Sequence, residues 1–190
     1  MTELYTYIKS ITGFSAGSWD ILRADLTQLK ISKGDYLVRE GEVGTSIFFI
    51  CQGYCRAFYN QDGIEINTSF YFENDFVTNI KSLTQNIPSE YFIQACEDLL
   101  TIKLPKTKLL DAYQKSHEIE SFGRKLLELL ITRQEEHTNL FKLLKASERY
   151  EYLTKNHPEI LQRVSLSHIA SYLGVARETI SRIRGKNVKK

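Results

Sequence analysis

The sequence has few of the residues that metal and redox chemistry requires. Among 190 residues there are only three cysteines, Cys51, Cys55 and Cys96, and four histidines, all of which follow residue 116. The cysteines lack the spacing of a zinc ribbon, and a cysteine-ligated iron–sulfur cluster normally needs four thiolates. We therefore predict no metal ion and no cofactor. We interpret the cysteines as buried structural thiols, and a redox role is the alternative.

Long apolar runs and enzyme motifs are also missing. The longest uninterrupted apolar stretch, Ile47–Cys51, is far too short to span a bilayer. The first ten residues lack the basic start and the apolar segment of a signal peptide. We therefore expect a cytoplasmic protein with no membrane partner. Because there is no nucleophile motif and no pair of carboxylates at a convincing catalytic spacing, we predict that it is not an enzyme.

Charge is present in both signs but is distributed unevenly. The whole chain carries 25 basic and 23 acidic residues. Residues 142–190 hold eleven basic and four acidic residues, a net charge of +7, whereas residues 1–141 hold fourteen basic and nineteen acidic residues, a net charge of −5. A basic terminal module on an acidic body is typical of a protein that binds nucleic acid.

The last 26 residues, Ser165–Lys190, have the pattern of a helix-turn-helix. Ser165 is a natural N-cap for the first helix, and Gly174 can turn the chain before the second helix. Ala170 is small enough for the two helices to cross closely. The alternative is a surface helix with a solvated basic face, but the combined spacing favours the DNA-binding motif.

The second helix of this motif divides into an apolar and a charged arc at 100° per residue. Ala176, Ile180 and Ile183 share the apolar arc and must face a core. Arginine is the side chain best shaped to read guanine, and glutamate can accept a hydrogen bond from cytosine. We therefore predict double-stranded DNA as the partner. The predicted contacts are the outward residues Arg177, Glu178, Ser181, Arg182 and Arg184.

Between residues 30 and 104 the pattern is that of short strands separated by glycines. The β-rich runs are Tyr36–Val38, Ile47–Cys51, Cys55–Tyr59, Ile64–Phe72, Tyr91–Ala95 and Leu99–Leu104. Asp62-Gly63 between two alternating runs is a strong hairpin signal, and the whole pattern predicts an antiparallel barrel or roll. Residues 1–30 are expected to be mostly helical, with a break near Thr12–Ser18 and a following helix capped by Ser18 or Asp20.

A long helix is predicted over about His117–Leu144. Its apolar residues recur near heptad spacing and are interrupted by the polar segment Thr132–Asn139, in which His137 can titrate near neutrality. We favour pairing with a second copy, because a helix-turn-helix usually binds two-fold sites as a dimer. The alternative is a helix packed on its own barrel. Shorter helices are expected at Lys106–Lys115, Lys145–Lys155 and Pro158–Gln162.

This order of elements resembles the family of the cAMP receptor protein and the fumarate-nitrate regulator, the Crp/Fnr family. The most specific element is GVARETISRIR at residues 174–184, which is similar to that family's recognition helix. The resemblance implies an α+β chain: an antiparallel β-roll of the cyclic-nucleotide-binding type (a double-stranded β-helix) at 1–115, a long dimerisation helix at 116–144 and a helix-turn-helix domain at 145–190. It further implies that Arg177, Glu178 and Arg182 read bases and that Thr179 lies at a phosphate. RNA polymerase is a further partner that it implies.

The residues that bind cyclic nucleotides in that family are replaced here. The family's phosphate cassette follows an Asp-Phe pair, present as Asp75-Phe76, and carries a Gly-Glu and an Arg-Ser. The corresponding positions hold Thr78-Asn79 and Ser89-Glu90, so we see no Arg or Lys near the phosphate position. A buried phosphate without a cationic partner is strongly disfavoured. We therefore predict that the chain does not bind cAMP or cGMP in the family's usual way.

The alternative function is a regulator that needs an unidentified small molecule in the β-roll in order to bind DNA. An apolar or uncharged ligand would fit the missing cation better than a phosphate. Each aromatic in such a set is, taken alone, more often ordinary core. The candidate ligand-binding residues are Tyr71, Phe72, Phe76, Thr78, Asn79, Ser89, Glu90 and Tyr91.

Two further departures from the family concern the DNA-binding module. Ala176 stands where the family often has a Ser or Thr that caps the recognition helix, and a missing cap costs about 1 kcal/mol. Only six residues follow Arg184, too few for the family's β-hairpin wing. We expect the basic tail of Lys186, Lys189 and Lys190 to take over part of the contact with the DNA backbone.

Overall fold

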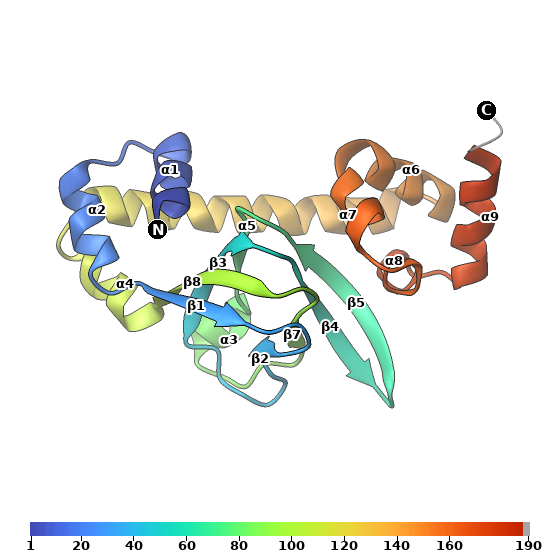
Figure 1. Cartoon of the computed structure of the whole chain (residues 1–190), viewed down its shortest axis with the longest axis horizontal. Coiled ribbons are helices and arrows are strands. Elements are labelled where there is room, and N and C mark those ends of the chain that lie inside the picture. The colour runs from blue at the N-terminus through green and yellow to red at the C-terminus, as the bar shows by residue number, and fades with distance from the viewer. Residues whose placement is uncertain (188–190) are drawn as a thin grey trace. The chain divides into compact units, whose positions relative to one another are not determined.

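The computed structural model describes the backbone of residues 1–187 and the side chains of residues 1–185 (Figure 1). Its contacts group into two compact units. The first, here the β-roll unit, comprises residues 1–58 and 70–129. The second, here the C-terminal unit, comprises residues 59–69 together with residues 130–190. The tip of one β-hairpin is therefore grouped with the C-terminal helices, and the boundaries expected from the sequence, near residues 115 and 144, remain predictions.

Two four-stranded sheets form the β-roll. Their pairings β1–β8, β8–β3, β3–β6, β2–β7 and β7–β4 are antiparallel. The first sheet has the order β1 (Thr27–Ile31), β8 (Leu99–Pro105), β3 (Ser46–Gln52) and β6 (Phe76–Val77). The second has the order β2 (Tyr36–Val38), β7 (Phe92–Ala95), β4 (Cys55–Gln61) and β5 (Ile64–Tyr71). The predicted α+β class with an antiparallel roll is thus confirmed.

Three elements of the roll differ from the sequence-based expectation. The helical interpretation of residues 1–30 is wrong from Thr27 onward, because β1 pairs along its whole length with β8, a partner 70 residues away in the chain that local propensity does not include. The two-residue strand β6 and the short helix α3 (Ile80–Gln85) were not predicted. Both are shorter than the windows in which hydrophobic periodicity can be recognised.

The core of the roll lies between the two sheets. Each sheet contributes alternate side chains to it, as period-two strands require. Burying each large apolar side chain contributes roughly 1.5–3 kcal/mol. The buried cluster comprises Val38, Phe48, Ile50, Cys55, Ala57, Val77, Ile93, Ala95 and Leu99.

The three cysteines differ in their environments. Cys55 belongs to the buried core, whereas Cys51 and Cys96 are half-buried, and all three are free thiols. Burial raises the pKa of the Cys51 and Cys96 thiols above their usual value. A raised pKa keeps a thiol protonated and poorly nucleophilic. The environment of these side chains therefore favours the structural interpretation.

Helices that precede and follow the strands in the sequence also belong to the β-roll unit. They are α1 (Thr2–Ile11), α2 (Ala16–Arg23), α4 (Lys106–Tyr113) and the first part of α5 (His117–Leu143). The expectation that Ser18 or Asp20 caps the second helix is wrong, since Ser15 is the N-cap and accepts from the Ser18 amide. The Ser15 hydroxyl and amide also donate to Glu118, and hydrogen bonds from Ser15 and Ser18 hold the pKa of that carboxyl at about 2.

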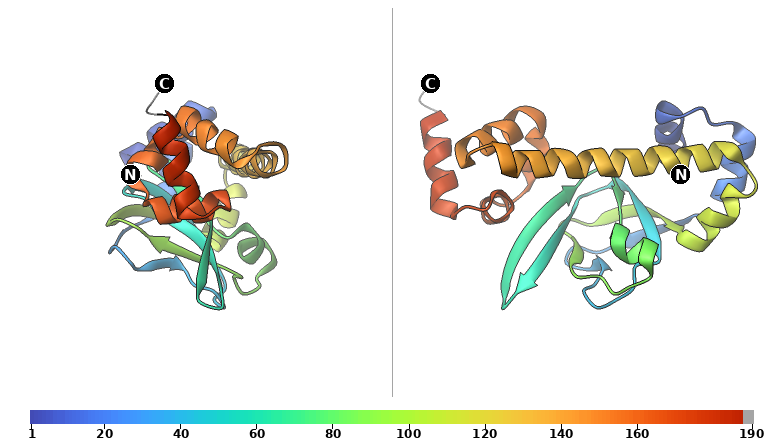
Figure 2. Two further views of the ribbon diagram at one scale, coloured as in Figure 1. Left: turned by 90° about the vertical axis from the view of Figure 1, so that its right-hand side faces the viewer. Right: turned by 180° about the vertical axis from the view of Figure 1, so that it is seen from behind.

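The C-terminal unit is helical apart from its hairpin tip. After the last part of α5 come α6 (Ala146–Asn156), α7 (Pro158–Arg163), α8 (Leu166–Leu173) and α9 (Arg177–Asn187). Seen from behind, α5 is one unbroken helix (Figure 2). The predicted ranges of α5, α6 and α7 agree with the structure to within one residue at each end. No helix within residues 1–187 combines the length and the apolar content that crossing a membrane requires.

Candidate nucleic-acid interface

Helices α8 and α9 form the helix-turn-helix that the sequence predicts. The Ser165 hydroxyl accepts from the His168 amide and begins α8, as expected. At its other end Gly174 has a φ of 67°, the left-handed conformation that glycine adopts without strain. The amides of Gly174 and Val175 donate to the carbonyls of Ser171 and Ala170, which is the hydrogen-bond pattern of a Schellman motif.

A small apolar core holds these helices against α6 and α7. Ala170 is 3% exposed, so the short side chain expected at the helix crossing lies in the interior. Ile180 on α9 is fully buried and anchors the second helix to the first. The buried apolar residues of the C-terminal unit are Leu140, Tyr150, Leu153, Ile160, Val164, Ile169, Ala170, Leu173 and Ile180.

The opposite face of α9 carries exposed charge. Arg177, Glu178 and Arg182 are exposed, and so are Ser181 and Arg184 on the next turn. Among the described residues neither Arg177 nor Glu178 has a side-chain hydrogen bond or an ion pair. Ile180 is buried and Ile183 half-buried, as the predicted apolar arc requires. Ala176, however, is exposed, so the expectation that it faces the core is wrong, because α9 begins only at the next residue, Arg177. The charged arc is available to a partner.

Thr179 differs from the exposed residues of this face. Thr179 is half-buried, and its hydroxyl oxygen lies 3.3 Å from Arg182 Nη2, which can donate to it. Such a contact orients Arg182 along the helix surface. The side chain of Lys186 and the residues Lys189 and Lys190 lie outside the part of the chain that is described, so the expected contact of the basic tail with DNA stays a prediction.

The hairpin tip contacts α8 at one side chain that sequence reasoning missed. The Ser171 hydroxyl donates to the Glu65 carbonyl at 2.8 Å and accepts from the Asn67 amide at 3.0 Å. One serine thus joins two main-chain groups on a strand more than 100 residues earlier in the sequence. A serine on the polar side of a predicted helix carries no signal for a contact at that separation.

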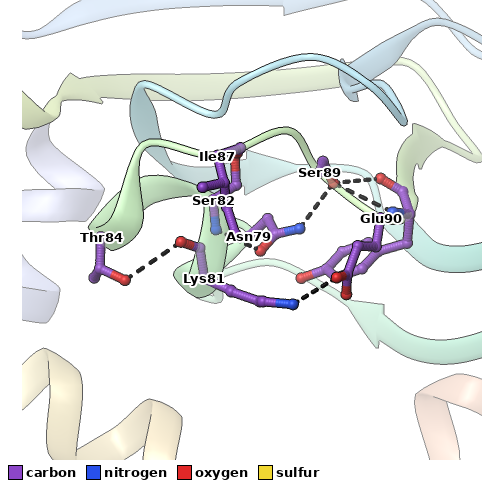
Figure 3. Close-up of polar contacts among 8 residues, drawn as sticks. Asn79, Lys81, Ser82, Thr84, Ile87, Ser89 and Glu90 are labelled. Carbon is purple, nitrogen blue, oxygen red and sulfur yellow. Dashed lines mark hydrogen bonds and ion pairs between the residues drawn. The ribbon is translucent and has the colours of Figure 1, made fainter.

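Two positions of the cassette that binds cyclic nucleotides in the Crp/Fnr family, Asn79 and Ser89, belong to a polar network with Ser82 (Figure 3). Asn79 and Ser89 are both buried, and the Asn79 amide nitrogen donates to the Ser89 hydroxyl at 2.8 Å. The Asn79 side-chain oxygen accepts from the Ser82 amide and caps α3. The Ser82 hydroxyl donates to the Ile87 carbonyl at 2.6 Å. These side chains are therefore already bonded within the chain itself.

One expectation about these positions is wrong, because a lysine lies beside Glu90. From the sequence we expect no Lys or Arg near the phosphate position. The structure places Lys81 on α3 in an ion pair with Glu90 (Figure 3). Both side chains are more than half exposed, so the pair lies on the surface of this region. The helical turn at Ile80–Gln85, which the sequence did not reveal, brings the two residues together.

Two of the aromatic candidates for ligand binding, Phe72 and Phe76, are buried. Phe76 packs against Phe49 at a ring separation of 5.0 Å, and Phe72 stacks on Tyr54 at 5.2 Å. Tyr71 and Tyr91 are half-buried and pack against the core between the sheets. Of the remaining candidates, Thr78 donates to the Ser46 carbonyl. The environment of Phe72 and Phe76 is therefore that of ordinary core aromatics.

Comparison with known sequences agrees with this geometry. The family model described as cyclic nucleotide-binding domain matches residues 28–116. A curated relative, the anaerobic regulatory protein of Aggregatibacter actinomycetemcomitans, is 29% identical over 169 residues. That match covers 82% of this chain and 65% of the relative, so the chain spans just under two thirds of the length of that protein.

Solved structures show the same fold over most of the chain. The c-di-GMP-responsive global regulator CLP of Xanthomonas campestris has a TM-score of 0.72 at 16% identity, with 92% of each chain covered. FixK2 of Bradyrhizobium japonicum has a TM-score of 0.68 at 20% identity, with 85% of this chain and 83% of that chain covered. At these identities the similarity concerns the fold.

A β-roll of the cyclic-nucleotide-binding type is thus followed along the chain by a long helix and a helix-turn-helix. Residues 28–116 match the cyclic nucleotide-binding domain family, and the chain is similar to a curated anaerobic regulatory protein and to solved structures that include a putative transcriptional regulator of the Crp/Fnr family.

Proposed function

We propose that this protein is a sequence-specific DNA-binding transcription regulator that binds two-fold sites as a homodimer and does not respond to cAMP. The single observation that supports DNA binding best is the division of α9. Ile180 is fully buried, while Arg177, Glu178 and Arg182 are exposed on the other arc and can enter a major groove. Contact between this basic module and phosphates makes the affinity fall with salt concentration.

Exposed apolar side chains on α5 support the homodimer. Leu127 is 47% exposed and Ile131 is 67% exposed, and their spacing of four residues places them on one side of the helix. Pairing of α5 with a second copy removes both from water. The two α9 helices of such a dimer lie in successive major grooves, with half-sites roughly 34 Å apart.

The network around Asn79 supports the lack of response to cAMP. A cyclic phosphate at this place would displace the buried bond between Asn79 and Ser89, and neither side chain offers a positive charge in return. The nearby cation, Lys81, is already paired with Glu90 at the surface. Contact with RNA polymerase remains a prediction.

The experiment that tests this proposal is the selection of random duplex DNA by the purified full chain without added ligand. We expect enrichment of a two-fold symmetric site. A matched variant, Arg177→Ala with Arg182→Ala, is expected to remain folded and to enrich nothing. If the unmodified chain is a folded dimer and enriches no sequence, a regulator that needs an effector replaces our proposal. A micromolar affinity for cAMP, measured by calorimetry, would contradict the second half of it.

A further inference from the structure

One arginine of the C-terminal unit bonds only to main-chain carbonyls. Arg149 on α6 donates from Nε to the Leu144 carbonyl at 2.9 Å, from Nη1 to the Leu173 carbonyl at 3.0 Å and from Nη2 to the Phe141 carbonyl at 3.1 Å. Its guanidinium carbon also lies 4.5 Å from the centroid of the Phe141 ring. Within the described chain no carboxylate pairs with it, so its bonds go to the backbone.

These three carbonyls belong to two helix ends. Phe141 and Leu144 lie at the C-terminal end of α5, and Leu173 is the last residue of α8. The last four carbonyls of a helix have no partner within it and carry partial negative charge. A planar guanidinium presents five donors in a fixed geometry, which lets one side chain bond to both ends at once. Arg149 therefore joins the end of α5 to the end of α8.

The joined point lies at the turn of the helix-turn-helix. Gly174 follows Leu173 directly, and a Cβ built on it would lie 3.8 Å from the Phe141 ring and 3.9 Å from Arg149 Nη1. Tyr172, the residue before Leu173, packs edge-on against Phe141 at 6.2 Å. Only three residues separate Leu173 from Arg177, the first residue of α9. The turn that aims α9 is thus held against the end of α5.

On the basis of the proposed function, we infer that Arg149 is a positioning residue. It sets the spacing between the two half-sites that the dimer recognises. In a two-fold dimer the separation of the two α9 helices follows from the pairing of α5 and from the orientation of α9 relative to α5. Arg149 fixes the orientation of α9 relative to α5. The side chains of α9 that read bases are separate from it, so the sequence of a half-site and the spacing between half-sites have different structural determinants.

The variant Arg149→Lys separates these determinants. Lysine keeps the positive charge but offers a single ammonium in place of the planar fork, and it cannot bridge three carbonyls with the same geometry. We expect the sequence of the half-site and the salt dependence to stay the same, and the affinity for an isolated half-site to change by less than about 3-fold. The preference for one spacing over the others is expected to fall by about 10-fold.

The experiment is a selection with the full chain on duplexes that carry two half-sites at every spacing across one helical turn, about 10 base pairs. Arg163→Lys, the same chemical change on α7, is the matched control and should retain the unmodified spacing profile. A relaxed profile for Arg149→Lys alone supports the inference. An unchanged profile overturns it while the proposed function stands, whereas failure of the unmodified chain to enrich any site overturns both.

A second variant tests the inference if Arg149→Lys does not fold. If circular dichroism shows that Arg149→Lys does not fold, Phe141→Leu decides instead, because it removes the ring beneath the guanidinium and leaves all three carbonyls in place. We expect Phe141→Leu to relax the spacing preference by about 3-fold at an unchanged half-site sequence. Retention of the unmodified profile by a folded Phe141→Leu overturns the inference.

Discussion

In the β-roll unit, Asn79 and Ser89 are buried and bond to each other, whereas in the C-terminal unit Arg177 and Arg182 stand exposed on one face of α9. The two left-handed glycines differ as well: a Cβ at Gly53 would collide with the Asp98 carbonyl oxygen, whereas a Cβ at Gly174 would make only ordinary van der Waals contacts. Polar groups of the roll therefore contribute mainly to its own stability, while those of α9 remain available for binding. Substitutions in the roll should therefore change mainly the free energy of unfolding, whereas substitutions on α9 should change mainly the affinity for DNA.

The largest expected effect is on the stability of the roll. An alanine Cβ at position 53 would lie 2.5 Å from the Asp98 carbonyl oxygen, and the φ of 84° disfavours any side chain. Gly53→Ala should lower the free energy of unfolding by about 3 kcal/mol or more, from strain and collision together. Gly174→Ala meets only ordinary contacts and should cost about 1 kcal/mol. Equal losses in urea unfolding would remove the contrast between the two turns.

The next effect is again on stability and tests the buried network. Asn79→Ala removes the cap of α3 and the shorter of the two hydrogen bonds that the buried Ser89 hydroxyl accepts, which should cost about 2 kcal/mol in the free energy of unfolding. Lys81→Ala, on the same short helix, breaks only an exposed ion pair and should cost less than about 0.5 kcal/mol. DNA affinity of the folded proteins should be unchanged in both, and a large loss of affinity in Asn79→Ala would contradict this separation.

Substitutions on α9 should weaken DNA binding and leave the stability of the fold nearly unchanged. Arg182→Ala should weaken binding to the selected site by about 1–3 kcal/mol and relax the base preference at one position, with a change in stability of at most about 0.5 kcal/mol. Gel-shift titration at fixed salt, together with thermal unfolding, measures both quantities. If the preferred sequence is unchanged in Arg182→Ala, the assignment of this side chain to the major groove is wrong.

The smallest effect concerns His137, which packs against Phe141 and Tyr172. Burial, with a lesser contribution from the positive charge of Arg133, lowers the pKa of this imidazole below 6.5. The unfolded chain then binds a proton that the folded chain does not, so stability present above pH 6.5 is lost as the pH falls from 6.5 toward the folded pKa. His137→Gln should flatten this part of the pH dependence of unfolding. Identical profiles for both proteins would mean that the imidazole does not titrate in this window.

The sequence sufficed for the elements whose pattern is local and repeated. Amphipathic periodicity located α5, and the capping residue Ser165 with the turn at Gly174 located the DNA-binding motif. The strand β1 was missed because its pairing partner lies far along the chain. For the candidate site, the outward arc of α9 follows from helix geometry alone. The bonds made by Arg149 and Ser171 depend on which helix end or strand lies nearby, and no local pattern encodes that.

The contact of Ser171 with the hairpin tip has a consequence for the order in which the chain folds during synthesis. Strands β4 and β5 can pair as soon as they are made, but the serine that joins the Glu65 carbonyl to the Asn67 amide is added about 100 residues later. At roughly 5–20 residues per second, the ribosome delivers it about 5–20 s after the hairpin. Completion of this hairpin therefore waits for α8, and a nascent chain truncated before α8 leaves its tip open to proteases.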